Sequence, residues 1–234
     1  MKKKEVRNQQ EFDACVAENN IAVVIGCKIV ARGNSMVEAW ENSKVEACGN
    51  SKVLACGNST VEAWDDCKIE AWGNSTVEAW GNSKVVARGN SKVLAWGYST
   101  VVARDDCTVV ARDDSTVVAL GNSTVEAWDD CKVEARENST VEARGNSKVE
   151  AWDNSTVETR DDCTVVARGN STVVAWGNSK VEARGNSKVE AWDNTFIRFF
   201  SCSKITASEG VVILKHNQSD SIEGGRQLDI IKTQ

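Results

Sequence analysis

Gly81-Asn-Ser-Lys-Val-Val-Ala-Arg88 is one copy of an eight-residue unit that repeats, without insertion or deletion, from Gly33 to Trp192. A fixed period kept over twenty consecutive units is typical of a solenoid, in which each unit contacts only its neighbours. The length of 234 residues would also allow one or two globular domains. Because the repeat covers most of the chain, we predict a single elongated domain instead.

The positions of each unit, numbered slot one to slot eight from Gly33, alternate in character. Slots three, five and seven are nearly constant as Ser or Cys, Val, and Ala, whereas slots four, six and eight vary among Lys or Thr, Glu, Val or Leu, and Trp or Arg. Alternate residues of a strand face opposite sides of a sheet, so the constant set should point inward. Slots one and two, mostly Gly-Asn or Asp-Asp, favour a turn. The sequence therefore predicts an all-β, parallel β-solenoid in which each unit is a short strand plus a turn.

The number of units in each coil is less clear from the sequence. Identical Trp or Arg residues in slot eight recur more often three units apart than two units apart, which favours a three-sided coil. Core volume favours a two-sided coil, because inward Ser, Val and Ala are too small to fill a triangular interior at normal packing density. We rank two units per coil first and keep three as the alternative.

The two ends of the chain depart from the repeat, and we divide the chain into an N-terminal cap (1–24), the solenoid (25–208) and a C-terminal cap (209–234). Phe12, Cys15 and Val16 are spaced as on one face of a short helix between Asn8 and Asn20. Such a helix would cover the first coil, since an open solenoid end exposes apolar core and a strand edge.

Short apolar runs predict strands on either side of the regular repeat. Ile21 to Ile25 should be the first strand, and Ser203 to Ala207 a last degenerate unit. Gly210 to Leu214 and Leu228 to Ile231 are predicted to form the strands of the C-terminal cap, with Glu223 to Gly225 as a turn.

No residue pattern indicates catalysis, a cofactor site or a metal site, so we do not expect an enzyme. The chain has one histidine, His216, and no phosphate-binding loop or nucleophile motif. The Asp pairs, such as Asp65-Asp66, are interpreted as turn residues. Among the nine cysteines, one set replaces the inward Ser of slot three and should be buried, namely Cys27, Cys67, Cys107, Cys131 and Cys163. Cys48 and Cys56 lie in the outward slot eight and should fall on opposite faces of a two-sided coil; all thiols are expected to be reduced.

The outward positions are where we expect function. Slot six is usually Glu but is apolar in five consecutive units, which form an apolar belt consisting of Val86, Leu94, Val102, Val110 and Val118. Contiguous exposed apolar residues are typical of an interface, although β-propensity alone also favours Val. All nine Trp residues occupy slot eight, including Trp64, Trp80 and Trp96, where rings could stack along the rim or contact a partner.

Charge and hydropathy restrict the partners. The repeat region has 25 acidic against 17 basic side chains, so we do not expect nucleic acid to bind. No apolar run is long enough for a signal peptide or a membrane span, and we expect a cytoplasmic protein without a membrane partner.

The repeat and its flanks together resemble a known group. Phrases of the form Ser-x-Val-x-Ala-(Trp/Arg)-Gly-Asn lie between Gln-Gln-Glu-Phe-Asp (Gln9 to Asp13) and Ile-Glu-Gly-Gly (Ile222 to Gly225). Over nearly the whole chain this is similar to octapeptide-repeat proteins of bacterial and phage genomes, a group with no established activity. The inward Ser-x-Val-x-Ala also resembles the Asn-x-Val-x-Gly of flat plant ice-binding β-rolls, which implies two units per coil.

We expect a non-catalytic binding or scaffold protein that presents its Trp and Arg side chains and the apolar belt to a protein partner or to a second copy. Its specific form would be a side-by-side homodimer through Val86, Val102 and Val118, with repulsion at Glu70 and Glu134 limiting the register. Two alternatives stay open. One is a phage or mobile-element DNA-mimic inhibitor of a host DNA-binding or defence protein, and the other is an ice- or polysaccharide-binding flat array.

Overall fold

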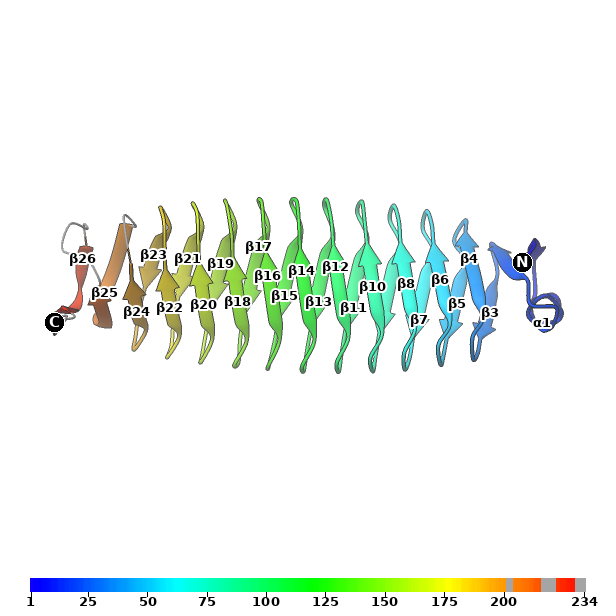
Figure 1. Ribbon diagram of the computed structural model, residues 1–234, viewed down its shortest axis with the longest axis horizontal. Helices are drawn as coiled ribbons and strands as arrows, with labels where there is room; N and C mark the ends of the chain where they lie inside the picture. Colours follow the sequence, from blue (N-terminus) through cyan, green and yellow to red (C-terminus); the bar gives the residue numbers. More distant parts are fainter. Residues whose placement is uncertain (201–203, 216–221, 230–234) are drawn as a thin grey trace. The chain divides into compact units, whose positions relative to one another are not determined.

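The computed structural model describes residues 1–200, 204–215 and 222–229, with side chains up to Leu214. The chain forms two compact units, Met1–Val117 and Val118–Gln234. In each, short strands lie side by side and are joined by tight turns (Figure 1).

The first unit contains helix α1 (Gln9–Ala17). Its strands are β1 (Lys3–Val6), β2 (Ile21–Ile25), β3 (Lys28–Ala31), β4 (Met36–Trp40), β5 (Lys44–Ala47), β6 (Lys52–Ala55), β7 (Thr60–Ala63), β8 (Lys68–Ala71), β9 (Thr76–Ala79), β10 (Lys84–Ala87), β11 (Lys92–Ala95), β12 (Thr100–Ala103) and β13 (Thr108–Ala111). Strand β14 (Thr116–Ala119) spans the boundary between the units.

The strands that follow in the second unit are β15 (Thr124–Ala127), β16 (Lys132–Ala135), β17 (Thr140–Ala143), β18 (Lys148–Ala151), β19 (Thr156–Thr159), β20 (Thr164–Ala167), β21 (Thr172–Ala175), β22 (Lys180–Ala183), β23 (Lys188–Ala191), β24 (Phe196–Phe199), β25 (Lys204–Lys215) and β26 (Ile222–Asp229).

Within the regular repeat, the strands pair in parallel with the second strand along the chain. Lys52 of β6 lies opposite Lys68 of β8, and in the second unit Lys132 of β16 lies opposite Lys148 of β18. One coil therefore contains sixteen residues, or two repeat units, one on each of its two faces. The prediction of a parallel β-solenoid with two units per coil is confirmed, and the three-sided alternative is wrong. In the first unit we call the face made by β4, β6, β8, β10 and β12 face A, and that made by β5, β7, β9, β11 and β13 face B.

The alternation of inward and outward residues is as predicted. Val109 in slot five is fully buried, whereas its neighbour Val110 in slot six is partly exposed. Each fully buried Val stabilises the fold by on the order of 1.5 kcal/mol. The buried Ser of slot three needs a hydrogen-bond partner in this apolar interior. Its hydroxyl donates to the carbonyl oxygen three residues earlier, as from Ser51 to Cys48 (2.9 Å) and from Ser187 to Arg184 (2.6 Å).

The turns depend on residues that accept a positive φ in slot one. Gly145 has φ 73°, and Asp161 takes the same conformation with φ 65°. The Asp161 carboxylate accepts a hydrogen bond from the Gly145 N–H (3.3 Å), sixteen residues earlier in the adjacent coil. The same bond joins Asp65 to Gly49 (3.1 Å), so the slot-one Asp of these pairs is a turn residue, as predicted.

Helix α1 closes the first coil. Asn8 caps it by accepting a hydrogen bond from the Glu11 N–H (2.9 Å), and Phe12 and Cys15 are buried as predicted. The Gln9 side-chain amide donates to the Val30 carbonyl (3.0 Å) and accepts from the Val30 N–H (2.7 Å). This side chain thus satisfies the edge of β3 in the way that another strand would.

At the start of the chain, Lys3–Val6 forms β1, which pairs in parallel with β2 and keeps its lysine side chains exposed. At the other end, one sequence interpretation needs correction. The segment from Glu223 to Gly225 is not a turn, because it belongs to strand β26 and pairs with β25. The first part of β25, Lys204–Ala207, continues the repeat in register with β23, as predicted for the last degenerate unit. Ser203, His216, Ile230 and Ile231 lie outside the described residues.

Candidate interaction surface

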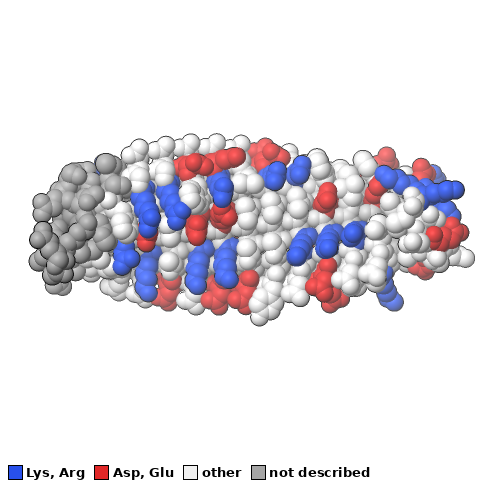
Figure 2. All heavy atoms as spheres, in the orientation of Figure 1, with Lys and Arg blue, Asp and Glu red and all other residues white. Residues whose placement is uncertain are grey.

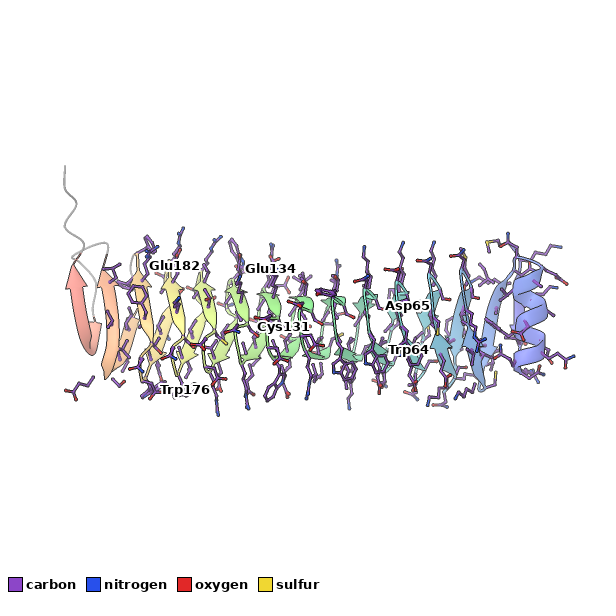
Figure 3. All side chains as sticks on the ribbon, turned by 90° about the horizontal axis from the view of Figure 1, so that it is seen from below. Trp64, Asp65, Cys131, Glu134, Trp176 and Glu182 are labelled. Carbon is purple, nitrogen blue, oxygen red and sulfur yellow. The ribbon has the colours of Figure 1, made fainter. Side chains whose placement is uncertain are left out.

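The predicted Trp residues form a continuous stack at the rim of face B. Trp64 and Trp80 follow β7 and β9, and their ring centroids lie 5.2 Å apart with planes inclined by 7°. Trp80 and Trp96 stack at 4.9 Å and 5°. Figure 3 shows Trp64 projecting from the edge of its coil. The three residues that the sequence singled out are therefore brought together, but each inner ring face is covered by a neighbouring ring.

In the second unit, arginines lie next to aromatic rings along both rims. The guanidinium of Arg144 lies 4.4 Å from the centroid of the Trp128 ring, and that of Arg168 lies 4.2 Å from Trp152. Arg184 similarly lies over Phe200 (4.7 Å). These are cation–π distances. A Trp and an Arg in slot eight of adjacent coils, two repeat units apart, therefore pack against each other as well as two Trp residues do. The count of identical Trp or Arg residues in slot eight therefore favoured a three-sided coil wrongly. It did not include Trp–Arg pairs, which also pack well along the rim.

The apolar belt of slot six is divided between the two faces. Val86 pairs with Val102 on face A, and Leu94 pairs with Val110 on face B. All four side chains are partly exposed. Val118, the fifth predicted member, is also partly exposed but belongs to the second unit. Each face of the first unit thus presents two adjacent apolar side chains where other coils have Glu.

A row of lysines lies beside the belt on face A. Lys52, Lys68 and Lys84 occupy slot four of three neighbouring strands, are exposed, and make no ion pair with any described residue. A surface groove of about 530 Å³ runs along this face and includes these lysines together with Leu54, Glu70 and Val86 among its lining residues. Figure 2 shows that basic and acidic side chains form short rows separated by uncharged surface.

Tyr98 is a surface residue that the sequence reasoning missed. It is 68% exposed, more than Trp40 (42%) or Trp72 (40%). The signal was available, because Tyr98 is the only tyrosine of the chain and occupies slot two, where Asn is usual. It lies at the turn before β12, next to the face A belt.

The slot-three cysteines are mostly structural. Cys67, Cys107, Cys131 and Cys163 are buried, and Figure 3 shows Cys131 near the middle of its coil. Burial raises the pKa of Cys67 and of Cys163 to about 11, which keeps these thiols protonated and unreactive at neutral pH. Cys27 differs from the prediction because it is only partly buried in the first, less regular coil. Among the described residues, no group of three or more His, Cys, Asp or Glu side chains is placed to hold a metal ion.

Comparisons with known proteins add no relationship. No protein-family model matches the chain, and neither the curated proteins nor the solved structures give a match. Within residues 1–200, 204–215 and 222–229, no helix has the length and apolar character needed to cross a bilayer.

Proposed function

We propose that this chain is a non-catalytic scaffold that associates with a second copy of itself through face A of its first unit. The observation that supports this best is the pairing of Val86 with Val102, two adjacent, partly exposed apolar side chains. Contiguous apolar residues on a protein surface are typical of an interface. The expected relationship to octapeptide-repeat proteins of bacterial and phage genomes and the expected cytoplasmic location are part of the same proposal.

The dimensions of face A suggest a weak complex. Five strands about 4.8 Å apart, each with four residues at about 3.3 Å, give roughly 300 Å² of flat area per copy. A standard interface buries about 800 Å² per partner. We therefore expect a dissociation constant in the micromolar range, so that the complex depends on protein concentration.

Sedimentation velocity from about 1 µM to about 200 µM, which brackets the micromolar range, tests the proposal. The wild type should shift from monomer to dimer, and Val86→Lys/Val102→Lys should remain monomeric, because it adds ammonium groups beside the lysine row of face A and leaves them without a partner in the interface. The matched control is Leu94→Lys/Val110→Lys, which makes the same change on face B and should still dimerise. A wild type that is monomeric throughout, or equal loss of dimer in both variants, contradicts the proposal.

The DNA-mimic alternative rests on a row of carboxylates on face B. Glu46, Glu62 and Glu78 lie on three neighbouring strands. Ion pairs within the chain reduce the negative charge of this row, because Lys28 contacts Glu46 and Lys44 lies 3.2 Å from Glu62. Competition between this protein and duplex DNA for a DNA-binding enzyme tests this alternative, and a lack of displacement at any protein concentration argues against it.

Ice or polysaccharide binding has less support. Aromatic sites for sugars need free ring faces, and those of Trp80 are both covered by neighbouring rings. Thr124, Thr140 and Thr156 do form one regular row in the second unit, but Glu126, Glu142 and Glu158 lie beside them. Thermal hysteresis and a glycan array are the direct measurements for this class.

A further inference from the structure

Face A carries two outward rows that differ in charge. The slot-four row is Met36, Lys52, Lys68, Lys84 and Thr100, and the slot-six row is Glu38, Leu54, Glu70, Val86 and Val102. The three lysines lie side by side on neighbouring strands, and none of them makes an ion pair with a described carboxylate. Their like charges therefore have no compensating partner in the described chain. Glu70 is likewise exposed and makes no ion pair with a described residue, whereas Glu38 is already bound by Lys3 (2.7 Å).

The position of these rows determines how two copies can meet. Along each strand, slots four and six point outward and lie on either side of the inward slot five, which marks the middle of the face. If the two-fold axis of a dimer is parallel to the direction in which the coils stack, slot four of each coil meets slot six of the same coil in the other copy. If the axis instead runs along the strands, slot four meets slot four, and the lysine rows face each other. Like charges facing each other across an interface disfavour the second arrangement.

We propose that two copies associate on face A with their stacking directions parallel, so that Lys68 of each copy pairs with Glu70 of the other. This inference rests on the proposed self-association and adds its orientation and register. An isologous contact of this kind forms the same ion pair twice and closes the assembly at two copies.

The neighbouring coils fit the same register. The aliphatic stem of Lys52 meets Leu54 of the other copy, and that of Lys84 meets Val86, while their ammonium groups extend to solvent. The Thr100 methyl group meets Val102. The groove of about 530 Å³ along this face is where the opposing side chains would enter.

A polyanion is the other occupant that a lysine row could accept. Glu70 argues against it, because this unpaired carboxylate lies beside Lys68 in the same strand and would repel an anion along the row. A second copy makes use of both charges, so it accounts for more of the face.

Charge reversal tests the register. Lys68→Glu and Glu70→Lys should each weaken dimerisation about tenfold, since each converts two symmetry-related attractions into repulsions. The double variant Lys68→Glu/Glu70→Lys restores opposite charges and should return to within about threefold of the wild type. All three variants change only the exposed residues Lys68 and Glu70, so circular dichroism should show an unchanged β-sheet signal.

The outcomes separate this inference from the proposed function. If the wild type dimerises but the double variant stays as weak as the single variants, or if no variant changes the dissociation constant, the register is wrong while self-association stands. If the wild type does not dimerise, the proposed function itself fails. If heparin displaces the second copy from the wild type at near-physiological salt, the lysine row is an anion site and the inference is overturned.

Discussion

The rims of the two units solve one packing problem with different residues. In the first unit the rim of face B is a stack of three indole rings, Trp64, Trp80 and Trp96. In the second unit the corresponding position is often Arg, whose planar guanidinium lies over a ring in an adjacent coil, as Arg144 does over Trp128. A flat side chain at strand spacing is thus the common requirement, and either a ring or a guanidinium meets it.

The arginines add a charge interaction that the indoles lack. Arg136, Arg144 and Arg184 each pair with the Glu two residues earlier in the same repeat unit. In the first unit the Glu residues instead pair with Lys from the preceding coil, as Glu62 does with Lys44 (3.2 Å). Rim stability should therefore depend on salt in the second unit more than in the Trp stack of the first.

The largest expected effect comes from the core, which is the same in both units. Val109→Asp places a charge in a thin, dry interior and should destabilise the fold by several kcal/mol. The adjacent Val110→Asp should leave the fold intact, because this side chain points outward. Circular dichroism compares the two, and an equal loss of β-sheet signal would contradict the assignment of inward and outward faces.

The next effect concerns two turn glycines, one from each unit, that differ in how close the neighbouring backbone lies. A Cβ at Gly177 would lie 2.9 Å from the backbone of Asp161, whereas one at Gly57 would meet nothing within 4 Å. Both glycines have positive φ, so Gly57→Ala should lose about 1 kcal/mol from conformational strain alone. Gly177→Ala should lose about 2 kcal/mol or more, because the contact adds to the strain. Urea unfolding measures both, and equal losses would show that the close contact is relieved without cost.

The last comparison, which includes the smallest expected effect, separates the two rims directly. Trp80→Ala removes two ring stacks and should lower the free energy of unfolding by about 2 kcal/mol at any salt concentration. Arg184→Ala removes an exposed ion pair and a cation–π contact, for about 0.5 to 1 kcal/mol, and this loss should shrink as salt increases. Urea titrations at low and high salt measure both losses of stability. If the two losses respond equally to salt, the predicted difference between the rims is wrong.

Most of the fold could be predicted from the sequence because the alternation within each unit is so regular. Ser, Val and Ala in slots three, five and seven identify the interior without any long-range information. The number of units per coil was harder to decide, because it depends on which side chains meet across coils. The preference of Arg for a Trp neighbour appears only once the sixteen-residue register is known, as for Arg168 over Trp152.

The candidate surface was predicted in part. The belt and the Trp residues were found because they break the Glu pattern of slot six or occupy one slot throughout. The lysine row of face A was missed because Lys52, Lys68 and Lys84 are sixteen residues apart and alternate in sequence with Thr60 and Thr76 of the other face. The turn predicted at Glu223 to Gly225 was wrong because pairing with a neighbouring strand overrides the local preference of glycine for turns. Gly224 continues β26 opposite Ala207.

The most direct test of the proposed scaffold is a zero-length carbodiimide cross-link, which joins an amine to a carboxylate that it contacts. Protein at natural isotope abundance is mixed in equal amounts with ¹⁵N-labelled protein, cross-linked above the dissociation constant and digested for mass spectrometry. We predict a Lys68–Glu70 cross-link between one light and one heavy chain, which can arise only across two copies. Mixed-isotope cross-links that involve only residues outside face A, or the absence of any mixed cross-link, would contradict association through face A, whereas a mixed cross-link between Glu70 and Lys52 or Lys84 would contradict only the register.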